Sequence, residues 1–315
     1  MSKCLYCYKE LKSGEVDFHA ECVHKFFGTS VAPKLNYTRK DMDGLAAEII
    51  QSQTTLTGVQ PKISLHLNKH EGCNRLTIVG LWGSFIFKPQ TDMYPYLPEN
   101  EDLTMRLAEA AGIDVVPHSL IRLKDGELGY ITRRIDRLSD NTKVAMEDFC
   151  QLSERTTEYK YKSSYEQVAK IIQEYSSVPV LDLTRYFELL IFCWLTGNND
   201  MHLKNFSLYQ PKDNEIRLTP AYDLVNAVIV NPQDNEELAL TLNARKRKIK
   251  TADIVQAMRK ADISDKVIAN MFRKFHRVST SWLPIIRQSF LPEVCQEAYW
   301  QLICERFSRL SENPI

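Results

Sequence analysis

The chain has 315 residues, and its 40 basic and 40 acidic side chains give a formal net charge of zero. A content of 44% hydrophobic and 25% charged residues is typical of a globular protein, and the balanced charge gives no indication of nucleic-acid binding. No apolar run approaches the roughly 20 residues of a membrane-spanning helix. The first residues, MSKCLYCYKE, lack the apolar core of a signal peptide. We therefore expect a cytoplasmic protein with no membrane partner.

Four metal-ligating side chains near the N-terminus form the pattern C-x2-C-x11-H-x2-C: Cys4, Cys7, His19 and Cys22. Two closely spaced ligand pairs suit a tetrahedral Zn²⁺ ion, and the residues between the pairs are enough for a small hairpin. In a reducing compartment, metal binding is commoner than disulfide formation. We predict a zinc-ribbon-like hairpin over residues 1–35 with a structural Zn²⁺ ion. His24 is an alternative ligand, and reduced, partly buried thiols are the alternative interpretation.

Residues 36–137 are predicted to form a β-rich lobe. A helix over 40–52 precedes the polar loop TTLTGVQPK, and the strands ISLHL, RLTIVG and GSFIFK follow with alternating or β-branched residues. Pro98, the acidic residues 99, 101 and 102, and Gly112 predict a helix over 98–112. A hairpin over 118–136 is expected to turn at Asp125-Gly126.

Residues 138–315 are predicted to form a helical lobe. Apolar periodicity indicates helices over 163–175, 182–196, 251–261, 264–277 and 292–308. Two short strands, 205–210 and 216–224, are expected around the turn at 211–214. A β-rich lobe followed by a helical lobe predicts a two-lobed α+β fold.

A cluster of polar residues, TGNNDMHLKNFSL, follows the most apolar predicted helix. Asp200 and Asn205 are separated by four residues, and Asp223 follows on the next predicted strand. Phosphoryl transfer needs a carboxylate that accepts the proton of the nucleophile and oxygen ligands for Mg²⁺, and D-x4-N followed by an aspartate is the order of a kinase catalytic loop. The alternative is a hydrogen-bonded network that caps the helix.

The β-rich half contains the remaining parts of such a site in the order loop, lysine, glutamate. The segment TGVQPK (57–62) suits a phosphate loop, although it has one glycine, and Lys88 ends a predicted strand. Glu101 on the following helix is the expected partner of Lys88, and Glu99 is the competitor.

Several segments then resemble the HipA-type serine/threonine kinases, which are toxins of bacterial toxin–antitoxin systems. These segments are ENEDLTMRLAEAAGI, ITRRIDR, MEDFCQL, FCWLTGNNDMHLKNFSL, LTPAYDLVNA and LALTLNARKRKIK. The resemblance covers roughly residues 50–260 and implies a two-lobed kinase fold that uses ATP and Mg²⁺.

The resemblance also implies residue roles. Asp200 would be the catalytic base, His202 and Lys204 would lie near the transferred phosphate, and Asn205 and Asp223 would bind Mg²⁺. The residues implied to contact ATP are Lys88 with Glu101, the phosphate-loop residues Thr57, Gly58, Val59, Gln60 and Lys62, and, at the adenine, Arg133, Arg134 and Ile135.

Three departures from the family pattern matter. Only about fifty residues precede the phosphate loop, which resembles split members whose N-terminal subdomain is a separate protein. The loop serine that such kinases autophosphorylate is matched here by Thr55 and Thr57, with Thr54 adjacent, and phosphorylation there would add about two negative charges. Arg133 stands where the family usually has an acidic residue.

The expected function is that of an ATP-dependent protein kinase that acts as a type II toxin, phosphorylates a translation-related protein such as an aminoacyl-tRNA synthetase, and autophosphorylates. The expected partners are the protein substrate, a small helix-turn-helix antitoxin of the HipB type and a separate protein similar to the N-terminal subdomain, with operator DNA reached only through the antitoxin. The alternatives are a catalytically silent regulatory subunit that binds antitoxin and operator DNA, and a small-molecule kinase. The basic run Arg245–Lys248 is a solvated face or contacts DNA or an acidic partner.

Overall fold

The structure is a computed structural model that describes residues 2–42, 44, 61–69, 74–79, 83–138, 142–212 and 214–310. It divides into two compact units, and each is described by itself. Unit 1 comprises Met1–Asp102, Val116–Thr142 and Gln288–Leu291, and unit 2 comprises Leu103–Val115, Lys143–Arg287 and Pro292–Ile315. The predicted hairpin segment 1–35 is thus a part of unit 1. None of the described helices is long and apolar enough to span a membrane.

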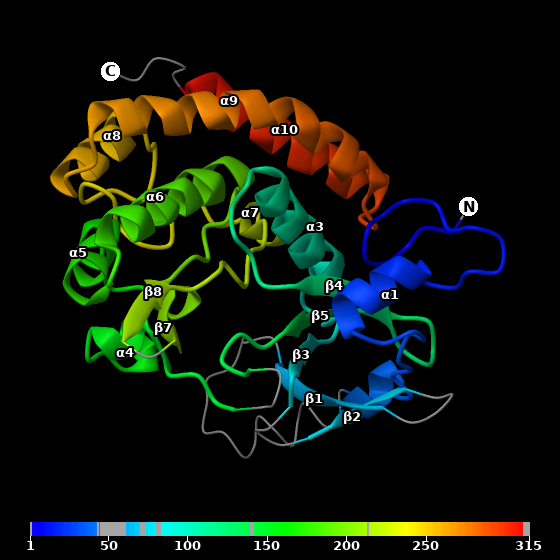
Figure 1. The fold of residues 1–315 in the computed structure, drawn as a ribbon. Coiled ribbons are helices and arrows are strands. Elements are labelled where there is room, and N and C mark those ends of the chain that lie inside the picture. The colour runs from blue at the N-terminus through cyan, green and yellow to red at the C-terminus, as the bar shows by residue number, and fades with distance from the viewer. Residues whose placement is uncertain are drawn as a thin grey trace. The chain divides into compact units, whose positions relative to one another are not determined.

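The described part of unit 1 contains a five-stranded antiparallel sheet with the strand order β2-β1-β3-β5-β4 (Figure 1). The strands are β1 (Ile63–Asn68), β2 (Arg75–Ile78), β3 (Phe85–Lys88), β4 (His118–Arg122) and β5 (Leu128–Arg133). Alternation fixes the buried face, since Ile63 and Leu65 are buried and Ser64 between them is half-buried. Gly129 is required in β5, because a Cβ atom there would lie 2.2 Å from the ring of Phe87.

The N-terminal segment packs into the core of unit 1. Residues Lys3 and Glu10 form an antiparallel bridge, and helix α1 (Ala20–Phe27) follows. The rings of Phe26 and Phe27 lie within about 6 Å of Phe85 on β3. These apolar contacts make the hairpin and the sheet one core.

Helix α3 (Leu97–Ala110) contributes Leu97–Asp102 to unit 1 and its remaining residues to unit 2. It agrees with the helix predicted over 98–112, and Gly112 follows it with a left-handed φ of 69°. Its first turns are unusual for their buried polar side chains. Glu101 and Asp102 are 2% and 0% exposed, so these carboxylates need partners inside the protein.

Unit 2 is mainly helical. Its long helices are α5 (Tyr165–Tyr175), α6 (Pro179–Thr196), α8 (Thr251–Lys260), α9 (Asp265–Gln288) and α10 (Glu293–Arg309). Helix α6 packs against α5 and α10, and rings of α9 contact Phe307 of α10 (Figure 1). Among the described residues of unit 2, three strands pair in the order β6-β7-β8. The strands and short helices are β6 (Met146–Asp148), β7 (Ser207–Lys212), β8 (Glu215–Leu218), α4 (Phe149–Leu152), η1 (Thr157–Tyr159), η2 (Leu203–Asn205) and α7 (Ala227–Val230).

The α+β class is as predicted, but several element boundaries differ. Helix α9 continues to residue 288 where the periodicity predicted an end at 277, because Trp282 and Ile286 extend its buried face and Pro284 is accommodated inside it. The strand expected over 216–224 ends at Leu218, after which Ala221 makes only an isolated bridge to Val115. The helix predicted over 40–52 lies mostly outside the described residues.

Candidate active site

The polar loop 198–205 begins at a rigid point, the end of helix α6. Every residue from Leu189 to Asn199 is buried. Gly197 ends the helix with a left-handed φ of 71°, and a Cβ atom there would lie 2.4 Å from Leu302 of α10 and 2.9 Å from the Oδ1 atom of Asn226. Only glycine fits this conformation and this space, so the start of the loop is tightly fixed.

The loop folds around the backbone carbonyl of Asp200. That carbonyl accepts a hydrogen bond from the His202 N–H at 2.8 Å and another from the Asn205 side-chain amide at 3.0 Å. The N–H of Asp200 itself donates to the Asn198 Oδ1 atom at 3.2 Å. Because the amide nitrogen of Asn205 holds the loop, its oxygen is the end that can serve a cation.

Tyr161 is a site residue that the sequence did not reveal. Its hydroxyl donates to the Asp200 Oδ1 atom at 2.5 Å, and its ring meets His202 edge-on with centroids 4.9 Å apart. Burial raises the pKa of Tyr161 far above its usual range, and the charges of Asp200, Asp234 and Asp223 raise it further. The Tyr161 phenol therefore stays protonated and remains a hydrogen-bond donor. The negative charges of three carboxylates, those of Asp200, Asp234 and Asp223, all affect its hydroxyl group. No local pattern connects Tyr161 to Asp200, 39 residues later.

Lys204 is held by a second residue that was not predicted. Its ammonium lies 2.7 Å from the Asp148 Oδ2 atom. Asp148 also caps helix α4, with Gln151 completing a capping box. The D-x-x-Q spacing in MEDFCQL is a sequence signal that would have identified this cap.

Asp223 is tied to the same loop through its neighbour Tyr222. The Tyr222 hydroxyl donates to the Lys204 carbonyl at 3.1 Å and lies 2.6 Å from the Ser207 hydroxyl. Asp223 has a φ of 60°, in the left-handed region that non-glycine residues seldom adopt. Such backbone strain is maintained only where the surrounding contacts impose it, and functional sites are common places for it.

Lys88 and Glu101 form a buried ion pair in unit 1. Their exposed fractions are 3% and 2%, and the Lys88 Nζ atom lies 2.6 Å from the Glu101 Oε1 atom and 5.4 Å from the centroid of the Tyr130 ring. Glu99, the competing partner, is oriented differently: its Oε2 atom is buried without a hydrogen-bond partner among the described residues. Burial raises the pKa of Glu99 to about 7, and the charges of Glu127 and Asp102 add to the shift.

The segment expected to meet adenine is partly occupied by contacts within unit 1. The N–H groups of Arg133 and Arg134 donate to the carbonyls of Pro117 and Ser84. The Arg133 guanidinium lies about 6 Å from the ring centroids of Phe26 and Phe85, and burial lowers its pKa. The contact of this segment with adenine stays a prediction.

The phosphate-loop predictions lie outside the described residues, apart from Lys62. Lys62 is exposed and directly precedes β1. The residues outside the described ranges are Thr54, Thr55, Thr57, Gly58, Val59 and Gln60. Their roles in ATP binding and autophosphorylation stay predictions.

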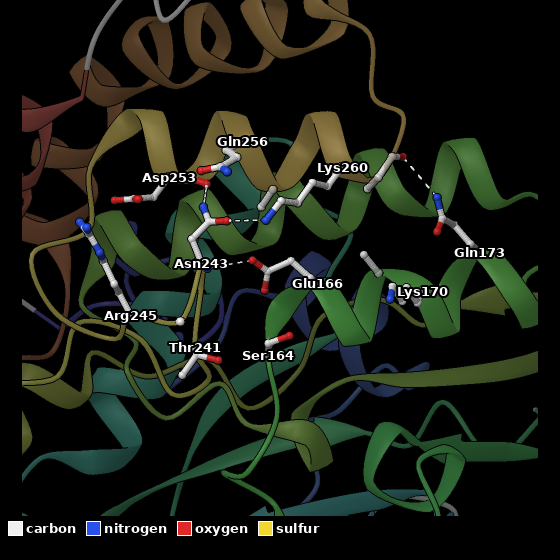
Figure 2. A pocket seen from close by; sticks show the side chains of 14 residues that line it. Ser164, Glu166, Lys170, Gln173, Thr241, Asn243, Arg245, Asp253, Gln256 and Lys260 are labelled. Atoms are coloured by element: carbon white, nitrogen blue, oxygen red, sulfur yellow. Dashed lines mark hydrogen bonds between the residues drawn. The ribbon is translucent and has the colours of Figure 1, made fainter.

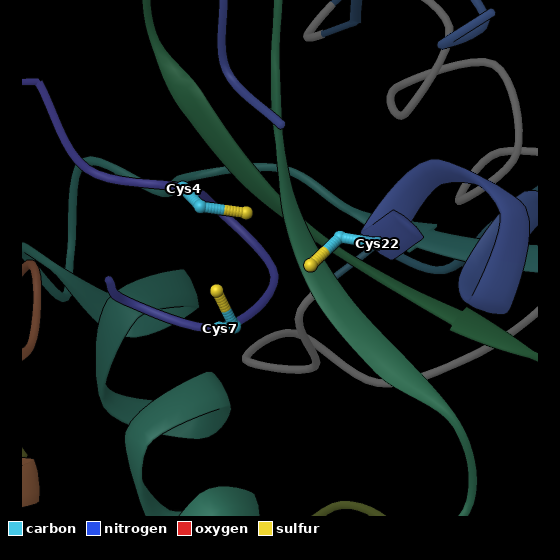
Figure 3. Close-up of side chains that lie close together, drawn as sticks. All are labelled: Cys4, Cys7 and Cys22. Atoms are coloured by element: carbon cyan, nitrogen blue, oxygen red, sulfur yellow. The ribbon is translucent and has the colours of Figure 1, made fainter. Parts of the chain in front are cut away.

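Among the described residues, the thiols of Cys4, Cys7 and Cys22 form a group in which all sulfur atoms lie within 4.8 Å of one another (Figure 3). The structure does not bring His19 into this group. The His19 Nδ1 atom lies 2.7 Å from a carboxylate oxygen of Glu15. The three thiols suit a soft cation such as Zn²⁺, and the fourth ligand stays a prediction.

Unit 2 also contains an open cavity of about 790 Å³, lined by residues of 164–173 and 241–261 (Figure 2). Asn243 joins its walls by hydrogen bonds: its N–H donates to Glu166, its side-chain amide donates to the Asp253 carbonyl, and its Oδ1 atom accepts from Lys260. No described residue of the predicted site lines the cavity. Its polar groups form a structural network around Asn243.

Comparison with known sequences places the chain in a family. Residues 54–282 match the model of the HipA-like C-terminal domain. A Haemophilus influenzae protein named "Putative kinase" is 26% identical over 327 residues, which is 93% of each chain. Two Sinorhizobium fredii proteins with the same description, Y4dM and Y4mE, are each 31% identical over 70% and 61% of this chain. This chain covers only 56% and 46% of their lengths.

Two solved structures share the fold. The Shewanella oneidensis MR-1 HipA toxin, solved with HipB and its operator DNA, gives a TM-score of 0.67 at 19% identity over 86% of this chain and 73% of its own. The Helicobacter pylori proinflammatory kinase CtkA gives a TM-score of 0.54 at 14% identity over 79% of this chain and 95% of its own. The fold is therefore the α+β fold of these kinase-like proteins, as predicted. Because the HipA-like C-terminal domain covers well over half of the sequence, the chain belongs to the HipA-like kinase family.

Proposed function

We propose that the protein is an ATP-dependent serine/threonine protein kinase. One observation carries the proposal. In the polar loop the Asn205 side-chain amide donates a hydrogen bond to the Asp200 carbonyl, and Tyr222, the neighbour of Asp223, donates to the Lys204 carbonyl of the same loop. A purely structural helix cap would not need a strained aspartate at position 223 or a tyrosine that donates to the Asp200 carboxylate.

The donor set fits a magnesium nucleotide. Asn205 and Asp223 offer the amide and carboxylate oxygens that Mg²⁺ prefers, and the nitrogen of Asn205 is already engaged with Asp200. When bound, ATP and Mg²⁺ supply the transferable phosphoryl group and neutralise its charge. Lys88 would contact the phosphates, and Glu101 orients its ammonium.

Asp200 would accept the proton of the substrate hydroxyl as that oxygen attacks. The hydrogen bond from Tyr161 to the Oδ1 atom fixes the orientation of the carboxylate. His202 and Lys204 would lie near the transferred phosphate, with the Lys204 ammonium steadied by Asp148. This arrangement works by positioning and charge stabilisation, which dominate phosphoryl transfer.

We further propose the role of a type II toxin. The family membership and the fold shared with a HipA toxin support this proposal. The kinase would phosphorylate a translation-related protein such as an aminoacyl-tRNA synthetase and would autophosphorylate at Thr54, Thr55 or Thr57. A HipB-type antitoxin would restrain it, a separate protein similar to the N-terminal subdomain would be a further partner, and operator DNA would be reached through the antitoxin. A structural Zn²⁺ ion in unit 1 completes the proposed cofactors.

The test is transfer of labelled γ-phosphate from ATP to protein by wild-type chain, Asp200→Asn and Asp234→Asn. Asparagine keeps the acceptor for Tyr161 but cannot take a proton, so Asp200→Asn should lose at least about 100-fold of the rate. Asp234→Asn removes an equal charge beside Tyr161 and should stay within about tenfold of wild type. If Asp200→Asn still transfers phosphate at the wild-type rate, Asp200 is not the catalytic base. Transfer only to small molecules, or no transfer by the wild-type chain, would refute the protein kinase.

A further inference from the structure

We propose that Cys4, Cys7, His19 and Cys22 hold one Zn²⁺ ion whose task is to fix Tyr8 against the first turns of α3, the helix that carries Glu101. The zinc site and the contact of Tyr8 with α3 do not depend on the kinase proposal. Only the expected effect on phosphoryl transfer rests on the proposed function.

The three thiols converge from separate parts of the chain. Cys4 and Cys7 come from the N-terminal hairpin and Cys22 from the first turn of α1, and their sulfur atoms point toward a common centre (Figure 3). Tetrahedral ligands at about 2.3 Å from zinc lie about 3.8 Å apart. The observed separations, all within 4.8 Å, need only a small contraction to reach that geometry.

His19 is the side chain best prepared to be the fourth ligand. It is the N-cap of α1, three residues before Cys22, so the two side chains share a face of the helix start. The Glu15 carboxylate, 2.7 Å from the Nδ1 atom, favours a proton on that nitrogen and leaves the Nε2 lone pair for a metal. A carboxylate behind a metal-binding histidine is the usual arrangement. His24 is exposed, two residues past Cys22, on the other side of α1.

The turn between the thiols forces an unfavourable conformation on Tyr8. The Tyr8 N–H donates to the Cys4 carbonyl at 2.9 Å, and the Cys4 N–H donates to the Lys9 carbonyl at 2.8 Å. Tyr8 has a φ of 65°, in the left-handed region that is rare and unfavourable for a bulky residue. Metal ligation on both sides of the turn would hold it in this shape.

In this conformation the Tyr8 side chain lies in the core of unit 1. Tyr8 is 3% exposed, and its hydroxyl donates to the Asp102 Oδ2 atom at 2.6 Å. The other carboxylate oxygen, Oδ1, lies 2.7 Å from the His118 Nδ1 atom. Asp102 is thereby held between the hairpin and strand β4.

Asp102 directly follows Glu101 in α3, so contacts that fix the position of Asp102 also restrict the position of Glu101. Glu101 in turn contacts the Lys88 ammonium at 2.6 Å. The path from Cys7 through Tyr8, Asp102 and Glu101 to Lys88 lies entirely within unit 1. Tyr8 is therefore a positioning residue, and zinc loss would loosen the start of α3.

The zinc site is tested by metal content. The full chain, purified under reducing conditions, should contain about one zinc per molecule, and Co²⁺ should give thiolate charge-transfer absorption. The Cys4→Ser/Cys7→Ser variant should lose the metal, while Cys304→Ser, at an exposed thiol outside the group, should keep it. His19→Ala and Glu15→Gln should weaken binding at least about tenfold, and His24→Ala should not. Wild-type chain that binds neither metal would overturn the proposal, even if the cysteine variants fail to fold.

The coupling to α3 is tested with Tyr8→Phe, which keeps the ring and the thiols but removes the hydroxyl. We expect full zinc content, faster amide hydrogen exchange at residues 99–105 and at least about fivefold lower kcat/KM for ATP. Tyr37→Phe, at another half-buried tyrosine of unit 1, is the control and should change none of these. Unchanged exchange in zinc-loaded Tyr8→Phe would refute the coupling whether or not the chain is a kinase. Faster exchange in a chain without phosphoryl transfer would instead refute only the proposed function.

Discussion

Glu99 offers a quantitative test of the packing in unit 1. Burial, with smaller contributions from Glu127 and Asp102, raises its pKa from 4.5 to about 7. The folded state therefore retains a proton that the unfolded chain releases between about pH 4.5 and pH 7. At 1.36 kcal/mol per pKa unit, the stability lost across this range is about 3 kcal/mol.

The sign of the effect follows from the raised pKa. Below about pH 4.5 both states are protonated and Glu99 has no effect on the free energy of unfolding. Between about pH 4.5 and pH 7 the unfolded chain loses the Glu99 proton while the folded chain keeps it, so the free energy of unfolding falls across this range; above about pH 7 both states are ionised and the loss is complete. Glu99→Gln keeps the shape without the charge, so the variant should gain up to about 3 kcal/mol over wild type at pH 8 and almost nothing at pH 4.5.

The assay is chemical denaturation of wild type, Glu99→Gln and Glu10→Gln between pH 4.5 and pH 8. Glu10 is an exposed glutamate of the same unit, so its substitution should change stability by less than about 0.5 kcal/mol. A difference between wild type and Glu99→Gln that is the same at both pH values would refute the reasoning.

Three further predictions concern two positions at the polar loop 198–205 and one half-buried glutamate elsewhere in unit 2. Gly197→Ala should lower the free energy of unfolding by about 2–4 kcal/mol in denaturation, because the left-handed φ and the contact with Leu302 both oppose a Cβ atom; a loss under 1 kcal/mol would contradict this. Tyr161→Phe should lower kcat for phosphoryl transfer about tenfold with little change in the KM for ATP, since the phenol orients the Asp200 carboxylate; a pure KM effect would argue against that role. Glu237→Gln should remove stability at pH 7 but not near pH 2: burial opposes ionisation of Glu237, but Arg309 and Arg306 outweigh it and lower the pKa to about 2, so this stability is lost as pH falls from about 4.5 to 2. Equal losses at both pH values in thermal unfolding would exclude this linkage.

Local patterns predicted much of the fold. The hairpin at Asp125-Gly126 and the helix that begins near Pro98 were predictable because turn residues, caps and apolar periodicity lie close together in the sequence. The helix end at 277 was wrong because burial of Trp282 and Ile286, which is a tertiary effect, extends α9 past Pro284.

The candidate site could be proposed from the sequence only where a short spacing or a recognisable order links its residues, and its function stays a prediction. Asp200 and Asn205 could be found from their spacing, and Lys88 and Glu101 from their order. Tyr8 and Asp102 lie 94 residues apart, so their hydrogen bond leaves no periodic trace. The left-handed backbone of Tyr8 and Asp223 is imposed by surrounding contacts, and the sequence carries no sign of it at non-glycine positions.

The most direct test of the central claim is a single-turnover measurement of γ-phosphoryl transfer from magnesium ATP to protein, with ATP affinity measured on the same preparations. Asp200 is proposed to act on the substrate hydroxyl rather than on the nucleotide. Asp200→Asn should therefore bind ATP with an affinity close to that of wild type and transfer phosphate at least about 100-fold more slowly. A variant that binds ATP much more weakly but transfers phosphate at the wild-type rate would contradict the account.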